Sequence, residues 1–296
     1  MWKLALFMVA LHTLGRIPLP ILYRLVSFMA DLIYILFPKL RHNVWDNLRH
    51  VMPAGTPKRR IRAVARQVFR NVALYYADLA HLPHMDVQRF FDRRLKLYGI
   101  NEHLMPAVKS GQGVVILGAH FGNPEFAAQG LIPLGVHLFA LTEPQEPERL
   151  TRMLDEMRSS KGHTFAPVSV GNVKRVVRTL KQGGAVALMG DRDIEGPRAR
   201  LPFLGVETLM PTGPIEVALR TGAVVVPGFS YRVGTRIIAY LEEPLDLKRT
   251  GSMEEDVRRG TLEFLARFEP HLRKDPGQWA VLESVWDGPG DGDQRN

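Results

Sequence analysis

Short apolar runs that alternate with helical stretches from residue 113 onward are the feature that most constrains the fold of this chain. The runs at residues 113–118, 137–141 and 185–189 each read as a buried strand, and glycine-containing turns follow the first and the last of them. Such alternation is typical of α/β proteins, in which helices connect the strands of one sheet. The sequence therefore predicts an α/β fold.

Helices are expected before, between and after these runs. They are predicted at residues 57–77, 125–134, 148–159, 173–181, 214–221 and 252–272. Residues 223–231 and 236–241 should form a hairpin around Gly234, which would add an antiparallel pair. We therefore predict a central mixed sheet flanked by helices.

The N-terminal segment is strongly apolar. Residues 4–15 contain one histidine and no charged side chain, and apolar stretches continue to Phe37. Asp31 interrupts the last stretch, and a charge near the centre of a membrane-spanning helix costs about 3 kcal/mol. Because Arg16 and Arg24 can reach lipid headgroups, we expect an interfacial, membrane-docking helical segment. A helical pair buried in a soluble core is the alternative.

Basic residues exceed acidic ones, and the net charge is +9. Such a chain is attracted to anionic membranes, acidic carrier proteins or nucleic acid. Charge alone therefore leaves open a non-catalytic protein that binds membranes or nucleic acid through Arg59, Arg60, Arg93 and Arg94.

The sequence lacks the signatures of several enzyme classes. There is no cysteine, which removes disulfides, thiolate metal sites and cysteine nucleophiles. There is no His-Glu-x-x-His zinc motif, no Walker or dinucleotide glycine loop, and no Gly-x-Ser-x-Gly nucleophile elbow. We therefore expect no metal, no bound cofactor and no serine nucleophile.

Residues 118–125, which read Gly-Ala-His-Phe-Gly-Asn-Pro-Glu, lie where a buried strand ends and a helix begins. Ligands of open α/β sheets bind at that end of the strands. Asn123 and Pro124 are suited to begin the helix, which fixes His120 just outside it and Glu125 in its first turn. Glu125 would then orient His120 as a general base for acyl transfer. Spacing alone leaves open that Glu125 only favours the helix dipole and that His120 packs.

A histidine and an acidic residue separated by four residues resemble the motif shared by glycerolipid (lysophospholipid) acyltransferases. The wider sequence is similar to one branch, the late acyltransferases of lipid A biosynthesis and the related phosphatidylinositol mannoside acyltransferases. The segments that carry this resemblance, in chain order, are Arg41, Asn43, Asn47 and Leu48, then residues 120–125, Arg158 with Gly162, and residues 191–193, 202–205, 211–214, 224–227 and 276–279. Two departures concern the acceptor. The Pro-Glu-Gly-Thr block of glycerol-phosphate acyltransferases is absent, and residues 280–286 replace the family's basic-aromatic ending.

The resemblance implies a glycerol-phosphate acyltransferase-like architecture and three regions: membrane-associating helices at residues 1–39, a catalytic domain at 40–286 and a polar tail at 287–296. It further implies transfer of a fatty acyl group from acyl carrier protein or acyl-CoA to a hydroxyl of a membrane glycolipid, at the cytoplasmic face of the inner membrane. The acceptor would be a lipid A precursor, a phosphatidylinositol mannoside or another glycolipid, with no nucleic acid partner.

Further residues are expected to bind substrate. They are Asn123, Arg158, Asp191, Arg192, Thr212 and Gly213. Arg158 and Arg192 are suited to hold a phosphate, although either residue is also suited to a salt bridge, with Asp191 or Asp193 as a partner for Arg192. Asp191 would orient an arginine or the acceptor, although a turn role is common for aspartate after a strand. Thr212 and Gly213 precede a helix, where backbone amides bind anions or a developing oxyanion, although simple capping is the more frequent role.

Overall fold

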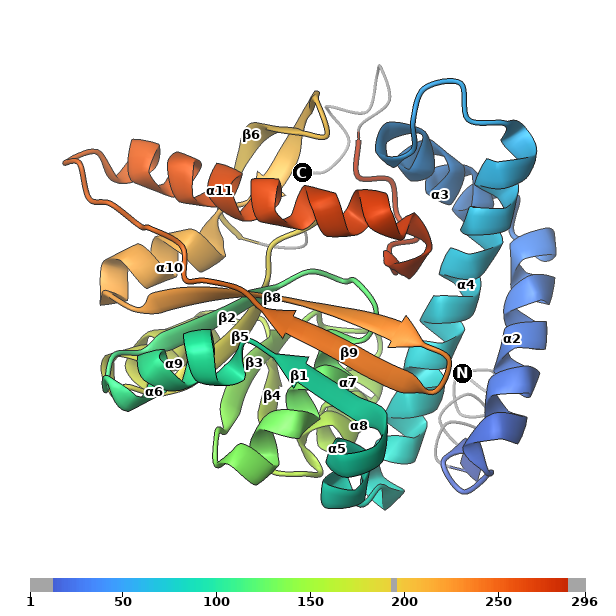
Figure 1. The fold of residues 1–296 in the computed structure, drawn as a ribbon, viewed down its shortest axis with the longest axis horizontal. Helices are drawn as coiled ribbons and strands as arrows, with labels where there is room; N and C mark the ends of the chain where they lie inside the picture. The colour runs from blue at the N-terminus through green and yellow to red at the C-terminus, as the bar shows by residue number, and fades with distance from the viewer. Residues whose placement is uncertain (1–12, 193–195, 287–296) are drawn as a thin grey trace.

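A mixed sheet forms the centre of the molecule in the computed structural model, which describes residues 13–192 and 196–286 (Figure 1). From edge to edge its strands are β1 (Leu95–Tyr98), β9 (Arg236–Leu241), β8 (Val224–Val233), β2 (Val114–Gly118), β5 (Ala185–Met189), β3 (Leu138–Thr142) and β4 (Thr164–Pro167). The pair β8–β9 is antiparallel and turns at Gly234, whereas all other neighbouring pairs are parallel. The predicted mixed sheet and its hairpin are thus confirmed.

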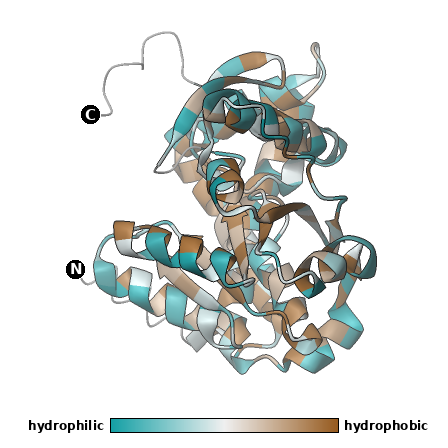
Figure 2. Ribbon diagram, turned by 90° about the vertical axis from the view of Figure 1, so that its left-hand side faces the viewer, coloured by the Kyte–Doolittle hydropathy of each residue, from teal (hydrophilic) through white to brown (hydrophobic). Residues whose placement is uncertain are grey.

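Helices cover both faces of this sheet. One face packs against α9 (Val170–Lys181), α10 (Gly213–Thr221) and α11 (Met253–Lys274) through a core cluster that includes Leu117, Phe229 and Phe268. The other face packs against the remaining helices of the α/β body, which are α5 (Val87–Arg94), η2 (Ile100–Leu104), α6 (Met105–Lys109), α7 (Pro124–Ala128), η3 (Gln129–Leu134) and α8 (Glu148–Ser159). Figure 2 shows hydrophobic residues concentrated in the central sheet, while the surrounding helices carry hydrophobic and hydrophilic residues together.

Two further elements lie beside the sheet. An antiparallel pair, β6 (Arg198–Phe203) and β7 (Val206–Pro211), leads from the end of β5 to α10. The short turn η4 (Pro276–Gln278) follows α11 and lies against α4. Both elements were left out of the sequence prediction, and η4 takes part in the site described below.

The N-terminal helices pack at one edge of the body, on the right in Figure 1. They are α2 (Leu19–Leu36), α3 (Pro38–Val51), α4 (Lys58–His81) and the short η1 (Leu82–His84). The Asp31 carboxylate of α2 accepts bidentate hydrogen bonds from Arg66 and Arg70 of α4, with N···O distances of 2.7–2.9 Å. Asp31 thus fastens the C-terminal half of α2 to α4.

α2 nevertheless leaves a row of large apolar side chains in solvent. Phe28 is 61% exposed and Leu36 is 68% exposed, and Ile21, Leu25 and Met29 are exposed as well. α2 is long and apolar enough to cross a membrane, a test that core helices and signal sequences also pass. Most of the apolar stretch at residues 4–15, with which the expected membrane-docking segment begins, and the polar tail (287–296) fall outside the described residues.

One predicted helix differs from the observed structure. Residues 125–134 were expected to form a single helix, but α7 ends at Ala128 and continues as the 3₁₀ turn η3. Pro133 lies inside this stretch, and a proline lacks the N–H that an α-helical hydrogen bond needs. α7 is therefore a short helix whose beginning, rather than its length, matters for the site.

Candidate active site

His120 lies in the loop that joins β2 to α7. Asn123 caps α7, since its Oδ1 accepts a hydrogen bond of 3.0 Å from the Phe126 amide. Gly122 has φ +70°, and a Cβ at this position would lie 2.0 Å from the Ser230 carbonyl oxygen. Only glycine therefore fits between the loop and β8, and the loop is held close to the sheet.

The imidazole of His120 is oriented by Asp191, which lies just past the end of β5. Nδ1 of His120 is 2.8 Å from Oδ1 of Asp191. Because an ionised carboxylate can only accept, Nδ1 donates this hydrogen bond, and Nε2 carries the lone pair. No hydrogen bond occupies Nε2 among the described residues, and His120 lines a cavity. This tautomer is the one that a general base requires.

Asp191 is held ionised in a buried position. Its side chain is 0% exposed, and its Oδ2 accepts a 2.8 Å hydrogen bond from Nε1 of Trp279. Burial alone would raise the pKa of Asp191, but the neighbouring His120 and the hydrogen bonds from His120 and Trp279 outweigh burial and leave the pKa below its ordinary value. The carboxylate is therefore charged at neutral pH and stabilises positive charge on His120.

The residues around Trp279 fix the His120 loop from the opposite side. The Ala280 amide donates to the His120 carbonyl at 2.7 Å, and the Gly122 amide donates to the Gln278 carbonyl at 2.8 Å. Phe121 and Trp279 form an isolated antiparallel bridge. Sequence analysis used residues 276–279 only for the family resemblance and missed this role, which no local pattern signals.

The expected pairing of Glu125 with His120 is corrected by these contacts. Oε2 of Glu125 accepts a 2.9 Å hydrogen bond from Nε of Arg158 instead. Glu125 lies in the first turn of α7, where its side chain reaches α8, whereas Asp191 extends from the strand that neighbours β2 in the sheet. The carboxyl ends of adjacent parallel strands lie at one edge, so Asp191 is the carboxylate delivered to His120.

Arg158 is fully engaged within the protein. Besides Glu125, it donates to Asp155 Oδ1 at 3.0 Å and to the Tyr75 hydroxyl at 2.9 Å. All three guanidinium nitrogens therefore have protein partners, although Arg158 and Glu125 both line the cavity. The structure shows the salt-bridge role that the sequence left open, and the phosphate role would require these contacts to break.

Replacing Arg158 by alanine should therefore destabilise the fold strongly. The change leaves Glu125 and Asp155 without their partner in a setting where side-chain exposures are 21% or less, and breaking a buried ion pair costs about 3–5 kcal/mol. Urea unfolding measures the loss. Arg152→Ala on the same helix is the control, because its ion pair with Glu148 is exposed and should contribute almost nothing. Equal stability of the two variants would contradict the assigned role.

The remaining predicted site residues are distributed around the cavity. Arg192 lines the cavity, but it pairs with Glu143 at 2.5 Å and approaches Glu283 at 3.6 Å, so the expected pairing with Asp191 is also corrected. Asp193 lies outside the described residues. Asn123 is 1% exposed and is used by the fold, which leaves its side chain no free group for substrate.

Thr212 and Gly213 lie at the start of α10. The Thr212 amide donates to the Pro197 carbonyl at 2.9 Å, and the Thr212 carbonyl accepts from Glu216 at 3.0 Å. Thr212 is therefore buried and engaged, and its amide is not available to an oxyanion. Gly213 lines the cavity wall.

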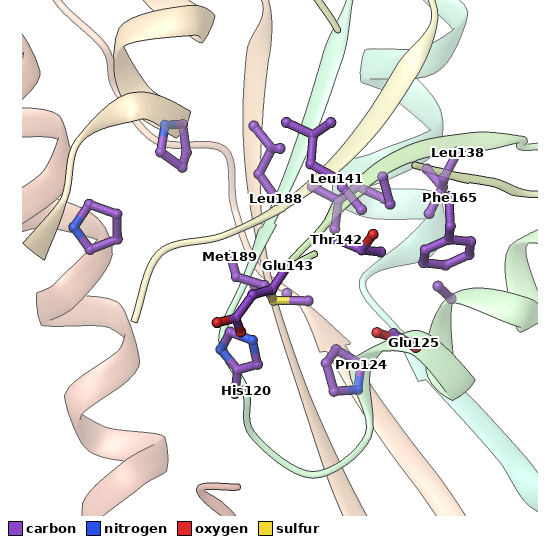
Figure 3. A pocket seen from close by; sticks show the side chains of 18 of the residues that line it. His120, Pro124, Glu125, Leu138, Leu141, Thr142, Glu143, Phe165, Leu188 and Met189 are labelled. Atoms are coloured by element: carbon purple, nitrogen blue, oxygen red, sulfur yellow. The ribbon is translucent and has the colours of Figure 1, made fainter. Parts of the chain in front are cut away.

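The cavity itself has a volume of about 700 Å³. It begins at His120 and is lined mainly by apolar side chains of β2, β3, β5, β8 and α9. Glycine and alanine occupy strand positions that would otherwise fill it, namely Gly118, Ala140, Ala187 and Gly228. Figure 3 shows Leu138, Leu141, Phe165 and Leu188 gathered on the side away from the His120 loop. The site thus places a basic nitrogen beside an apolar space of ligand size.

Comparisons with known proteins show the family of this chain. A family model described as "Bacterial lipid A biosynthesis acyltransferase" matches residues 1–287. A phosphatidylinositol mannoside acyltransferase of Mycolicibacterium smegmatis is 28% identical over 237 residues, which cover 79% of this chain and 74% of that protein. A protein of the same name from Mycobacterium tuberculosis is 26% identical over 215 residues, which cover 72% of this chain and 66% of that protein.

A structural comparison matches the 1-acyl-sn-glycerophosphate acyltransferase PlsC from Thermotoga maritima. The match covers 86% of this chain and 95% of the PlsC chain, with 14% sequence identity and a TM-score of 0.40. The alternative of a non-catalytic basic protein is set aside by the family match, which extends over nearly the whole chain. The chain belongs to the bacterial lipid A biosynthesis acyltransferase family and is an acyltransferase.

Proposed function

We propose that His120 is the general base for transfer of a fatty acyl group from a thioester to a hydroxyl of a membrane glycolipid. The observation that carries this proposal is the Nδ1–Asp191 hydrogen bond, which leaves Nε2 free at the cavity. Nε2 takes the proton of the acceptor hydroxyl while the oxygen attacks the thioester carbonyl carbon. The tetrahedral intermediate collapses, the C–S bond breaks, and the thiolate takes the proton back from His120.

Asp191 supports both halves of this cycle. It keeps the Nδ1–H tautomer before attack, and its negative charge stabilises the imidazolium that forms during attack. Trp279 holds Asp191 in line by occupying its second oxygen. The proposal needs no acyl-enzyme intermediate and no bound cofactor. Glu125, which the sequence placed in the orienting role, instead supports the cavity wall through Arg158.

The cavity is proposed to hold the acyl chain. Its lining is largely apolar, and burial of a hydrocarbon chain contributes about 0.8 kcal/mol per CH₂ group. Arg192 and Arg220 also line it, each paired with a glutamate, Glu143 and Glu216. A phosphate of the phosphopantetheine carrier would have to replace these glutamates as their partner. A net charge of +9 suits either acyl carrier protein or acyl-CoA, both of which are acidic donors.

The acceptor is proposed to reach His120 from a membrane. The exposed apolar row of α2 can enter the acyl region of a lipid layer, while Lys58, Arg59 and Arg60 at the start of α4 are exposed and suit anionic headgroups. Because the donors are cytoplasmic thioesters, we place the enzyme at the cytoplasmic face of the cell (inner) membrane. The acceptor would be a glycolipid of the lipid A precursor type.

A second candidate acceptor is a phosphatidylinositol mannoside. This candidate is favoured by the names of the mycobacterial relatives, which are 26–28% identical to this chain. The two acceptors share sugar hydroxyls beside a lipid anchor, so the same base would serve both. An assay with each acceptor in turn therefore distinguishes the two candidates.

The test uses the full-length protein, vesicles that contain one acceptor at a time, and palmitoyl-CoA or palmitoyl-acyl carrier protein. Mass spectrometry should show one acceptor gaining one acyl group, and intact-protein mass should show no acylated enzyme. Hydrolysis of the thioester without acylation of either acceptor, or a stable acyl-enzyme, would contradict the proposal.

Enlarging Ala187 should shorten the acyl chain that the enzyme prefers. Ala187 lines the cavity from β5 and pairs with Ala140 of β3, another lining residue. A phenyl ring at position 187 would occupy part of the space, whereas Ala187→Val would occupy less. Rates with thioesters of graded length measure the preference, and urea unfolding checks for strain, since overpacking costs about 1–3 kcal/mol. An unchanged length profile in stable Ala187→Phe would show that the chain binds elsewhere.

A further inference from the structure

A buried polar cluster joins α2 to the His120 loop without touching the cavity. It consists of Tyr23, Asp78, Arg94, Asn123 and Arg232, which we call the Asp78 cluster. The Asp78 side chain is 0% exposed and that of Arg232 is 3% exposed. None of the five residues lines the cavity, so none is placed to touch substrate.

Asp78, on α4, is the hub of this cluster. Its Oδ1 accepts a hydrogen bond from the Tyr23 hydroxyl of α2. Its Oδ2 accepts from Nδ2 of Asn123 at 2.8 Å and from Nη2 of Arg232. One carboxylate thus connects the exposed N-terminal helix, the active-site loop and β8.

Tyr23 is bound as a neutral donor. Arg94 and Arg232 donate to its hydroxyl oxygen at 3.0 and 3.2 Å, which leaves the hydroxyl proton for Asp78. Burial and the neighbouring Asp78 charge raise the pKa of Tyr23 to about 12. The hydroxyl therefore keeps its proton throughout the neutral range.

The first connection from Asp78 to the catalytic pair runs through Asn123. Asn123 uses Nδ2 for Asp78 and Oδ1 for the Phe126 amide, so one side chain fixes the end of the His120 loop and the start of α7. Its own amide donates to Ser230 Oγ at 3.0 Å, and Ser230 in turn donates to the Phe121 carbonyl at 2.9 Å. The backbone that directly follows His120 is therefore fixed by groups that meet at Asp78.

The second connection runs through Arg232. Its amide donates to Oε1 of Gln278 at 3.1 Å, and its carbonyl accepts from Nε2 of Gln278 at 2.9 Å. Gln278 holds the Gly122 amide and precedes Trp279, which binds Asp191. Asp78 therefore reaches His120 through Asn123 and reaches Asp191 through Arg232, Gln278 and Trp279.

A contribution to fold stability alone does not explain why such a buried polar cluster is present. Replacing a buried ion pair with well-packed apolar residues is often neutral or stabilising, because desolvation offsets most of the attraction. Holding a geometry is the better-supported use of a buried hydrogen-bond network, and in this cluster Asp78 and Asn123 use both of their side-chain polar atoms, while Nε of Arg232 has no partner among the described residues. The two connections both end at the catalytic pair, so the geometry in question is that of the active site.

We propose that Asp78 is a positioning residue that links α2, through the Tyr23 hydroxyl, to the His120–Asp191 pair, so that turnover depends on α2 being seated on the body. This inference rests on the proposed role of His120 as base. Displacement of α2 removes one donor from Asp78, loosens Asn123 and Arg232, and lowers the fraction of enzyme in which Nε2 is aligned with the acceptor.

The test compares kcat and KM for three single variants and one double variant of the full-length protein. Tyr23→Phe removes only the hydroxyl. Asn123→Ser keeps an oxygen that can cap α7 but lacks the donor to Asp78. Tyr34→Phe is the matched control, since Tyr34 lies on the same helix and its hydroxyl accepts a hydrogen bond from Trp45, which is outside the cluster.

Tyr23→Phe and Asn123→Ser should each lower kcat about 3- to 10-fold, as loss of one buried hydrogen bond predicts, with KM and vesicle binding unchanged. Tyr34→Phe should match the wild type. Because Tyr23 and Asn123 share Asp78, the double variant should lose less than the product of the two single losses. Thermal melts confirm that each variant is folded at the assay temperature. If Tyr23→Phe does not fold, Asn123→Ser must still show the kcat loss.

Three results would overturn the link. They are a wild-type kcat in folded Tyr23→Phe or Asn123→Ser, an equal loss in Tyr34→Phe, or single losses that multiply independently in the double variant. These results are distinct from failure of the proposal that His120 is the base. That failure would show as undiminished turnover in His120→Ala, whatever the kcat of the cluster variants.

Discussion

Replacing His120 by alanine is expected to lower kcat for acyl transfer by about 10²- to 10⁴-fold, the usual contribution of a general base. Nε2 of His120 carries the free lone pair at the cavity, and no other described residue pairs with Asp191 Oδ1. Binding of the thioester should change little, because the cavity walls remain. Initial rates with a saturating thioester and a glycolipid in vesicles measure the loss.

His137→Ala is the matched control for that measurement. His137 is exposed, does not line the cavity, and has its Nδ1 3.2 Å from the Gly162 carbonyl oxygen. Its removal should leave kcat unchanged. Undiminished turnover in a folded His120→Ala protein would require a different base, and the account of the site would be wrong.

Replacing Asp191 by asparagine should lower kcat by about 100-fold or more while the fold survives, because loss of a histidine-orienting carboxylate in a related type of site has effects of that order or larger. The amide has one acceptor and one donor group, whereas the site needs two acceptors, for Nδ1 of His120 and Nε1 of Trp279. If the NH₂ group faces His120, the imidazole takes the tautomer with the proton on Nε2 and cannot accept another. If the NH₂ group faces Trp279, two donors oppose each other.

Glu125→Gln provides the contrast for Asp191→Asn. Glu125 accepts from Arg158 and not from His120, so its neutral analogue should lower kcat far less and should instead lower stability. Measurements of kcat and of urea unfolding for both variants distinguish the roles of Glu125 and Asp191. A larger kcat loss in Glu125→Gln than in Asp191→Asn would restore the pairing that sequence spacing suggested.

The central strands and the position of the His120 loop were predictable because their signals are local. The bounds of α8 and β5 agree in full with the sequence prediction, since each run is bordered by turn residues. The capping of α7 by Asn123 was also predicted correctly, because the N-cap pattern of Asn and Pro is contained in adjacent residues.

The hydrogen-bond partners of His120 were not predictable from spacing. His120 and Asp191 are 71 positions apart and meet only because β2 and β5 are neighbours in the sheet. Glu125 is closer in sequence, but α7 turns its side chain toward α8. Trp279 and Asp78 come from still more distant segments, and their roles follow from tertiary packing that no periodicity encodes.

Short edge elements were missed for a different reason. β1 has four residues at the rim of the sheet, and β6 contains two arginines and a proline, so neither shows a sustained apolar pattern. β1 is stabilised by its parallel register with β9, and β6 by pairing with β7. Their existence depends on partners, which a single stretch of sequence does not contain.

The most direct test of the central claim, that His120 and Asp191 act as one unit, is kcat of the double variant His120→Ala/Asp191→Asn. If Asp191 works only by orienting and stabilising His120, the double variant should be no slower than His120→Ala alone, as is found for catalytic groups that act together. If the two losses multiply instead, Asp191 has a role that does not pass through His120, and the proposed pair is contradicted.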